Sequence, residues 1–206
     1  MKNFDNSYLN DKIKLVAGTD EAGRGPLAGP VVAASVIFSP DVFIEGVNDS
    51  KKLSESKREN LYEKIINQSV ACDVAIVSHG KIDKINILNA SLLAMFNSVR
   101  RLSVNPDLIL VDGIKSFNYD VPVKAVIKGD SKSFCIAAAS IIAKVTRDQI
   151  MKRLSIHFPA YGWEKNKGYP TKYHIEVIKL IGASPLHRRT FLKNILVNKM
   201  ESDYNF

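Results

Sequence analysis

The chain contains 206 residues, of which 46% are hydrophobic and 24% are charged. This length allows one domain with a small appendage and excludes a large multidomain assembly, while the composition excludes a wholly disordered chain. Lys and Arg number 29 against 21 Asp and Glu, a formal net charge of +8, which favours a polyanionic partner such as nucleic acid.

The first part of the chain predicts two antiparallel strands. Residues 12–20 begin with alternating apolar positions, and residues 30–38 form a β-branched and small apolar run. The connecting segment is rich in Gly and Pro and too short for a crossover helix, so we expect the two strands to pair antiparallel.

The first ten residues lack the apolar core of a secretory signal, and no apolar run is long enough to span a membrane, so we expect a cytoplasmic protein.

The middle of the chain predicts a crossover between two parallel strands. Ser54 can cap a helix that ends near Ser69, and residues 71–78 follow as a strand. A helix with one continuous apolar stripe is expected from about residue 83 to residue 102, followed by a strand at residues 107–112. Because a strand, a helix and a strand in succession form a parallel pair, the sheet must be mixed.

The second half predicts one more strand and then helices only. Residues 121–128 form the fifth strand, and a long helix rich in Ala and Ile runs from Ser131 until Pro159 blocks it. A polar, basic and aromatic segment leads into a helix that Thr171 caps and Gly182 ends. The last quarter of the chain is therefore predicted to be a helical appendage.

Four acidic residues lie at comparable ends of the predicted strands. Asp20 and Glu21 follow the first strand, Asp112 ends the fourth, and Asp130 lies between the fifth strand and the long helix. If these strands are neighbours, the carboxylates meet at one edge of the sheet and repel one another unless a divalent cation offsets their charge. Hard oxygen ligands favour Mg²⁺ or Mn²⁺. The alternatives are surface acids at strand ends and, for Asp130, a helix cap.

The glycine segment from Gly23 to Gly29 resembles a phosphate-binding loop only superficially, because a strand follows it where a dinucleotide-binding loop needs a helix. Its glycines allow backbone N–H groups to approach a ligand beside Asp20 and Glu21, and Arg24 can contact a phosphate. A plain hairpin turn is the alternative. The histidines and cysteines show no metal-ligand spacing.

Six segments in order along the chain resemble bacterial ribonuclease HII. They are TDEAGRGPLAGPVVAA from Thr19, DSKKL from Asp49, VDG from Val111, KGDSKSFCIAAASIIAKVTRD from Lys128, KGYPT from Lys167 and SPLHRRTF from Ser184. The related ribonuclease HIII usually has a Gly-Thr-Gly segment and an extra N-terminal domain. Here the sequence Gly23-Arg24-Gly25 favours HII.

This resemblance implies an α/β protein with the ribonuclease H-like fold, in which helices flank a mixed five-stranded sheet. The catalytic domain would span residues 1–158, and a C-terminal helical substrate-binding appendage would span residues 159–206. The family hydrolyses the RNA strand of RNA/DNA hybrids and incises DNA duplexes beside embedded ribonucleotides, leaving 3′-hydroxyl and 5′-phosphate ends, a reaction of DNA repair. We expect a monomer.

The resemblance also assigns roles to individual residues. The family's catalytic, metal-binding carboxylates fall on Asp20, Glu21, Asp112 and Asp130, and they imply two-metal phosphodiester hydrolysis with Mg²⁺ or Mn²⁺. The ribose 2′-hydroxyl would be recognised by Tyr169 and by the backbone of Gly23, Arg24 and Gly25. Basic residues offer phosphate contacts, with an ordinary solvated face as the alternative: Lys51, Lys52, Arg188 and Arg189.

Two other functions remain open from the residues alone. A DNA-cutting nuclease or recombinase of the same fold would use a similar acid cluster and differ in its choice of substrate. A catalytically silent nucleic-acid-binding module would bind without metal-dependent cleavage and would not need the complete set of carboxylates.

Overall fold

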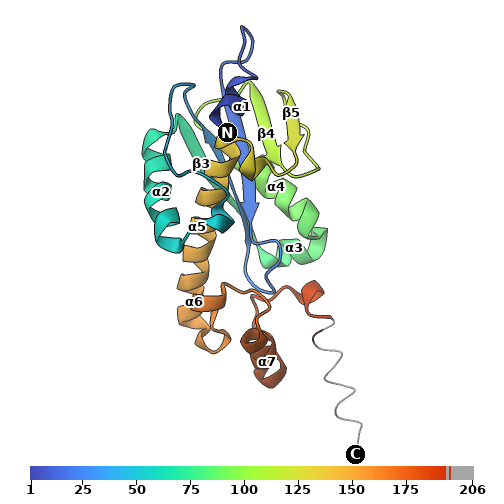
Figure 1. The fold of residues 1–206 in the computed structure, drawn as a ribbon. Coiled ribbons are helices and arrows are strands. Elements are labelled where there is room, and N and C mark those ends of the chain that lie inside the picture. The colour runs from blue at the N-terminus through green and yellow to red at the C-terminus, as the bar shows by residue number, and fades with distance from the viewer. Residues whose placement is uncertain (194, 196–206) are drawn as a thin grey trace, which may run out of the picture.

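The computed structural model describes residues 1–193 and 195, apart from the side chain of Lys52. A single five-stranded sheet of order β3-β2-β1-β4-β5 forms the centre of the molecule (Figure 1). Its strands are β1 (Val16–Ala22), β2 (Val31–Ile37), β3 (Ala71–Val77), β4 (Leu108–Asp112) and β5 (Val123–Val126). Each predicted strand is present, with the first shifted toward its C-terminal end and the fifth shorter than expected.

The sheet is mixed, as the sequence predicted. β1 pairs antiparallel with β2 and parallel with β4, and β2 pairs antiparallel with β3. The prediction that β3 and β4 pair with each other was wrong, because β4 lies between β1 and β5. The side chains of β4 are buried along almost the whole strand, whereas those of β3 vary in burial, so β4 takes an inner place and β3 an edge.

Helices cover both faces of the sheet and form the appendage. The α-helices are α1 (Lys2–Asn6), α2 (Glu55–Gln68), α3 (His79–Ile85), α4 (Ile87–Arg100), α5 (Phe134–His157), α6 (Trp163–Asn166) and α7 (Lys172–Ile181). Four short 3-10 turns lie at Ser50–Lys52, Gly129–Ser131, Pro159–Tyr161 and Arg189–Phe191. Helices α2 and α5 pack on one face and α4 on the other, which gives three layers.

Local capping explains most helix boundaries. Ser54 and Thr171 accept hydrogen bonds from the backbone N–H groups three residues ahead, as predicted for α2 and α7. The helix predicted across residues 83–102 is instead two helices, because Asn86 adopts a left-handed φ of 63° and caps α4. Within the described part of the chain, no helix is both long enough and apolar enough to cross a membrane.

Close approach of α5 to β1 sets the depth of the site. An added Cβ at Gly18 would lie 2.3 Å from backbone atoms of Cys135 and Ile136, so only glycine allows this contact. The first helix is anchored to the same place, since Asp5 Oδ2 accepts a hydrogen bond from the Cys135 N–H at 2.9 Å. Helix α5 therefore crosses the sheet directly beneath the strand that carries Asp20 and Glu21.

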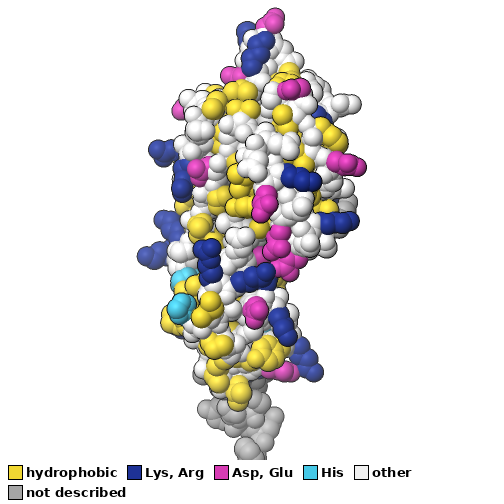
Figure 2. Space-filling view, turned by 90° about the vertical axis from the view of Figure 1, so that its left-hand side faces the viewer, with side chains coloured by type: hydrophobic (Ala, Val, Ile, Leu, Met, Phe, Trp, Pro, Cys, Tyr) yellow, Lys and Arg dark blue, Asp and Glu magenta, His cyan; other side chains and the backbone are white. Residues whose placement is uncertain are grey.

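The C-terminal helices share an apolar cluster with the loop that follows β1. Trp163 and Ile178 of the appendage pack with Leu27 and Ala28 of that loop and with Met151 of α5. On the face shown in Figure 2, Lys and Arg side chains are spread over the whole length of the molecule, and acidic side chains gather near the middle. The positive charge is thus distributed over this face.

Candidate active site

The parallel pairing of β1 with β4 brings two of the predicted acids together. Thr19 pairs with Val111, so the next residues along the two strands are Asp20 and Asp112. Asp112 ends β4, as predicted. The prediction that Asp20 and Glu21 follow the first strand was wrong, because β1 continues through both residues to Ala22.

A pocket of about 250 Å³ opens at this edge of the sheet. Eight of the predicted site residues line it: Asp20, Glu21, Gly23, Arg24, Gly25, Lys51, Asp112 and Tyr169. Ala22, Ser50, Ser140 and Lys144 complete the lining. Residues from widely separated parts of the sequence thus meet at one place.

Asp20 and Glu21 are held in an environment that disfavours their charged forms. Burial raises the pKa of Asp20 well above its usual value, and the neighbouring carboxylates of Glu21 and Asp112 raise it further. Hydrogen bonds from Ser140 and from the backbone N–H of Glu21 oppose the shift. Burial also raises the pKa of Glu21, although Arg24 Nη1 lies 3.3 Å from Glu21 Oε1 and lowers it.

Asp112 and Asp130 continue this acidic group. Burial raises the pKa of Asp112 and the charge of Asp130 adds to the effect, while Asp112 Oδ1 accepts a hydrogen bond from the Gly129 N–H at 2.6 Å. Lys51 Nζ lies 3.5 Å from Asp130 Oδ2. Asp130 does not cap α5, because Ser133 accepts the hydrogen bond at the start of that helix. The capping alternative is therefore excluded.

The carboxylates are neighbours, but their oxygen atoms do not converge on one position that a metal ion could occupy. Among the described residues, no group of three or more His, Cys, Asp and Glu side chains is arranged so that it could hold a metal ion as it stands. The donor chemistry nevertheless fits a hard divalent cation, since the three carboxylates of one pocket have raised pKa values and repel one another. Closing such a group around a cation requires rotation of acidic side chains.

The glycine segment and Tyr169 lie side by side. An added Cβ at Gly25 would lie 3.6 Å from Cε1 of the Tyr169 ring, and this tyrosine is 38% exposed. Two cations flank that ring, with Lys144 Nζ and Arg147 Cζ at 6.0 Å and 5.9 Å from its centroid. A polar, partly exposed aromatic ring therefore faces a backbone segment that lacks side-chain bulk.

The four predicted basic contacts lie in different environments. Lys51 and Arg189 are exposed, and the backbone N–H of Arg189 donates a hydrogen bond to Asp83 Oδ2 at 2.8 Å. The side chain of Lys52 lies outside what the structure describes. The prediction of a phosphate contact was wrong for Arg188, because this residue is 0% exposed and each of its guanidinium nitrogens donates to a backbone carbonyl.

Several residues of the site were not identified from the sequence. Ser140 and Lys144 project from α5 into the pocket one turn apart, and Ser140 Oγ lies 2.9 Å from Ser50 Oγ. The 3.6-residue spacing of polar positions in an otherwise Ala- and Ile-rich helix was the available signal. Arg147, one turn further along α5, is also buried and hydrogen-bonded to backbone.

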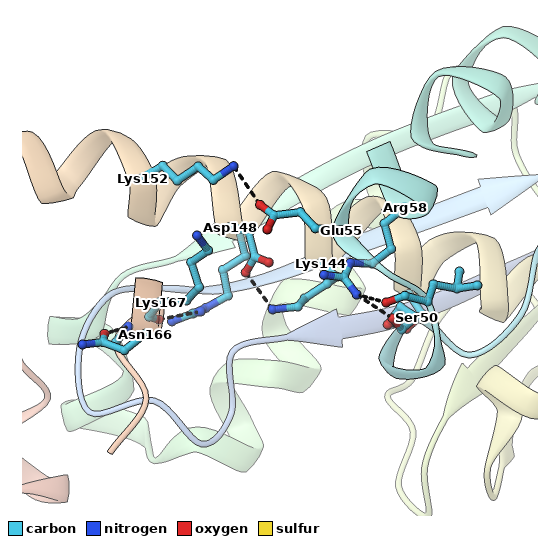
Figure 3. A network of polar contacts seen from close by, with 12 residues as sticks. Ser50, Glu55, Arg58, Lys144, Asp148, Lys152, Asn166 and Lys167 are labelled. Atoms are coloured by element: carbon cyan, nitrogen blue, oxygen red, sulfur yellow. Dashed lines mark hydrogen bonds and ion pairs between the residues drawn. The ribbon is translucent and has the colours of Figure 1, made fainter. Parts of the chain in front are cut away.

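A polar network extends from the pocket along α5 (Figure 3). Lys144 Nζ pairs with Asp148 Oδ1 at 2.8 Å, and Lys152 Nζ pairs with Glu55 Oε1 of α2 at 2.7 Å. Arg58 Nη1 donates to the carbonyl oxygen of Ser50 at 3.0 Å, which fastens the turn that carries Lys51 to α2. The turn beside the acids is thus supported by α2.

Comparison with known proteins identifies the family. The family model described as Ribonuclease HII matches residues 17–194. A ribonuclease HII from Caldicellulosiruptor saccharolyticus is 50% identical over 193 residues, which cover 94% of each chain. The solved ribonuclease H2 from Pyrococcus horikoshii OT3 is 31% identical with a TM-score of 0.74, covering 91% of this chain and 99% of that one. The structure of Bst-RNase HIII in complex with Mn²⁺ superposes with a TM-score of 0.66, and the match covers 93% of this chain and 72% of that one. At 18% identity, this similarity shows the fold alone. The chain belongs to the ribonuclease HII family.

Proposed function

We propose that the protein is an endonuclease that hydrolyses the RNA strand of RNA/DNA hybrids and incises DNA beside embedded ribonucleotides. Family membership across residues 17–194 supports the activity. The observation that supports its location is the single pocket in which Asp20, Glu21 and Asp112 meet the glycine segment and Tyr169. The products would carry 3′-hydroxyl and 5′-phosphate ends.

We assign the catalytic role to Asp20, Glu21, Asp112 and Asp130, which would together hold Mg²⁺ or Mn²⁺. A bound divalent ion supplies activation of water and stabilisation of the departing 3′-oxygen. The protein's own contribution is to keep these acids buried and close, so that their mutual repulsion favours cation binding. Lys51, beside Asp130, offsets part of the local negative charge of the acidic group.

Recognition of the ribonucleotide would depend on other groups that line the same pocket. DNA and RNA differ chiefly at the 2′-hydroxyl, so discrimination requires hydrogen-bonding groups near the sugar. Tyr169 offers a ring that can pack on the sugar together with a hydroxyl, and the segment Gly23–Gly25 offers backbone N–H groups without obstructing side chains at its glycines. The remaining proposed phosphate contacts are Arg24, Lys51, Lys52 and Arg189.

We further propose that residues 1–158 form the catalytic part and residues 159–206 a substrate-binding appendage. Within the appendage, residues 194 and 196–206 lie outside the described part of the chain. Tyr169 belongs to the appendage and the acids belong to the sheet, so both parts would contact one duplex. We propose that the protein acts as a monomer, because one chain supplies all of these groups. We also propose that it acts in the cytoplasm.

One experiment tests this function. Purified protein is incubated with an all-DNA duplex, an RNA/DNA hybrid and a DNA duplex that contains one ribonucleotide, each with Mg²⁺, with Mn²⁺ and with EDTA. We expect cleavage of the two ribose-containing substrates and only with metal. Equal cleavage of the all-DNA duplex would instead support a DNA-cutting nuclease, and binding without cleavage would support a silent binding module.

A further inference from the structure

Two arginines are buried beneath the pocket without acidic partners. Arg147 of α5 is 1% exposed, and Arg188, which follows α7, is 0% exposed. In the described part of the chain, neither guanidinium forms an ion pair with a carboxylate. A buried charge without a counter-charge is costly, so these groups must be satisfied by hydrogen bonds.

Arg188 donates its hydrogen bonds to the backbone of the glycine segment. Its Nη2 donates to the carbonyl oxygen of Gly23 at 2.7 Å, and its Nη1 donates to that of Arg24 at 2.9 Å. Its Nε donates to Gly29 at 3.0 Å, and Nη2 also donates to Pro30 at 3.1 Å. A single planar group thus holds both ends of the loop between β1 and β2.

Arg147 joins the same loop to the segment that carries Tyr169. Its Nε and Nη2 donate to the carbonyl oxygens of Pro30 and Ala28 at 3.0 Å and 3.2 Å. Its Nη1 donates to the carbonyl oxygen of Lys167 at 3.0 Å, two residues before Tyr169, and Figure 3 shows Lys167 beside α5. The loop and Tyr169 are therefore fixed relative to each other by one side chain.

The carbonyl bonds determine where the loop's N–H groups point. All peptide bonds in the described chain are trans, so the N–H of each residue points opposite to the preceding carbonyl. Since the carbonyls of Gly23 and Arg24 point inward to Arg188, the N–H groups of Arg24 and Gly25 point outward. Neither N–H donates to a protein acceptor within the part of the chain that the structure describes, and both residues line the pocket.

Two successive outward N–H groups form a concavity suited to an anion or a hydroxyl oxygen. Burial and the nearby charge of Arg147 lower the pKa of Arg188 to about 9, so the group is still protonated at neutral pH. Positive charge beneath the loop favours a phosphodiester in front of it. Gly23 fits this arrangement, because an added Cβ would lie 2.1 Å from Arg147 Nε and its φ is +101°.

We propose that Arg188 and Arg147 are positioning residues that aim the N–H groups of Arg24 and Gly25 at the ribonucleotide and hold Tyr169 opposite them. This inference rests on the proposed function, since it assigns the ribonucleotide to this pocket. It differs from a direct phosphate contact, because both side chains act only through the backbone that they hold.

A double-mutant cycle tests whether Arg188 acts through the loop. The variants are Arg188→Lys, which keeps the charge and loses the planar fork, Gly25→Ala, and the double variant. A methyl group at Gly25 meets only the Tyr169 ring at 3.6 Å, so it fits the folded chain while it intrudes on the pocket. The constants kcat and KM are measured on the duplex with one ribonucleotide. Arg153→Lys, an exposed change on α5, is the control and should match the wild type.

We expect each single variant to lower kcat/KM on this substrate roughly ten-fold or more. Because both changes damage one loop, the double variant should be no worse than the more impaired of the two single variants. In Arg188→Lys, hydrogen exchange of the backbone amides in the loop between β1 and β2 should be faster, and the melting temperature should fall, because buried carbonyl oxygens lose their donors.

The proposal would be overturned if the losses in kcat/KM of the two single variants multiply in the double variant, or if Arg188→Lys keeps the wild-type kcat/KM. If Arg188→Lys does not fold, Arg147→Lys enters the same cycle, and failure of both to fold would make the arginines general core residues and also overturn it. The proposed function itself would be contradicted by a different result, namely that the wild-type protein cleaves neither the RNA/DNA hybrid nor the duplex with one ribonucleotide.

Discussion

Asp20 is the least exposed of the acids of the site, and it lies beside Glu21 and Asp112. Its burial and the charges of these two neighbours disfavour its charged form. A folded-state pKa above the unfolded value means that the carboxyl stabilises the fold at low pH and loses that effect as the pH rises through the folded pKa. At neutral or alkaline pH the metal-free site is therefore a source of instability.

This repulsion leads to a prediction for Asp112→Asn. At pH 8 without metal, the variant should melt a few degrees above the wild type, since removing one charge relieves roughly 1 kcal/mol of repulsion. Adding Mg²⁺ should raise the melting temperature of the wild type more than that of the variant. Thermal melts with EDTA and with Mg²⁺ measure both effects, and Asp120→Asn, an exposed change, is the control. An equal Mg²⁺ response in wild type and Asp112→Asn would count against ligation by Asp112.

Tyr169 is predicted to contribute more to turnover than to affinity. Tyr169→Ala should lose roughly ten-fold or more of kcat/KM on a single ribonucleotide in DNA, with a much smaller loss of duplex affinity, because phosphate contacts elsewhere supply binding. Tyr169→Phe shows how much of the effect belongs to the hydroxyl. Steady-state cleavage and equilibrium binding separate the two quantities. Wild-type cleavage by both variants would make Tyr169 a packing residue.

Among single residues, the sequence located the acids better than the basic residues. It placed Asp20 and Asp112 at strand ends, but their proximity depended on β1 and β4 being neighbours, which the structure shows. Arg188 was misassigned because residue type favours the surface for an arginine, and its burial depends on the loop folding over it. No local pattern distinguishes it from the exposed Arg189.

The elements with clear local signals were predicted correctly. Helices α2 and α7 have capping residues at their starts, and β2 is a continuous apolar run. The division of α3 from α4 was missed because the apolar stripe continues across Asn86, whose left-handed backbone has no strong sequence signal. Which strand pairs with β4 depends on which strands are buried inside the sheet and which lie at its edges, and this cannot be predicted from local sequence.

The appendage contains two buried histidines, His174 and His187, and we expect the stability of the fold to depend on pH through them. His174 Nε2 accepts from Trp163 Nε1 at 3.1 Å and lies 3.1 Å from His187 Nε2, while the Ser184 N–H donates to His187 Nδ1 at 2.9 Å. These contacts require both rings to be neutral. Burial, together with His174, lowers the pKa of His187 to about 4.

His187 should therefore stabilise the fold above its unfolded pKa of about 6.5, and this contribution should be lost as the pH falls toward 4. Between those limits, the free energy of unfolding should fall on the order of 3 kcal/mol more in the wild type than in His187→Gln, whose amide does not titrate. Urea titrations at several pH values measure the difference, with the exposed change His157→Gln as control. Parallel pH profiles for wild type and His187→Gln would contradict this account.

Across the whole molecule, the loop after β1, helix α5 and the appendage share packing around Leu27 and Met151. Trp163, the only tryptophan of the chain, is fully buried in that cluster and so reports on the appendage. We predict that its fluorescence and the far-ultraviolet circular dichroism of the whole chain change at the same urea concentration, because shared apolar contacts make unfolding cooperative. A fluorescence transition at a clearly lower urea concentration would show that the appendage unfolds by itself.

The same shared packing supports a single site made from both parts. β1 and β4 supply Asp20, Glu21 and Asp112, α5 supplies Ser140 and Lys144, and the appendage supplies Tyr169. The groups proposed for the chemistry and for recognition of the sugar thus line one pocket. We therefore expect a strand to be cut only where a ribonucleotide is held in this pocket beside the acids.

The most direct measurement is metal-dependent incision of a DNA duplex with one ribonucleotide by wild type and by Asp20→Asn, with the affinity of each for the duplex measured in EDTA. We predict incision beside the ribonucleotide by the wild type. In Asp20→Asn we predict a loss of roughly a hundred-fold or more in the incision rate, with duplex affinity changed only a few-fold, because the carboxylate acts in the reaction and phosphate contacts provide binding. Incision by Asp20→Asn at the wild-type rate, or a wild type that cuts the all-DNA duplex equally well, would contradict the account.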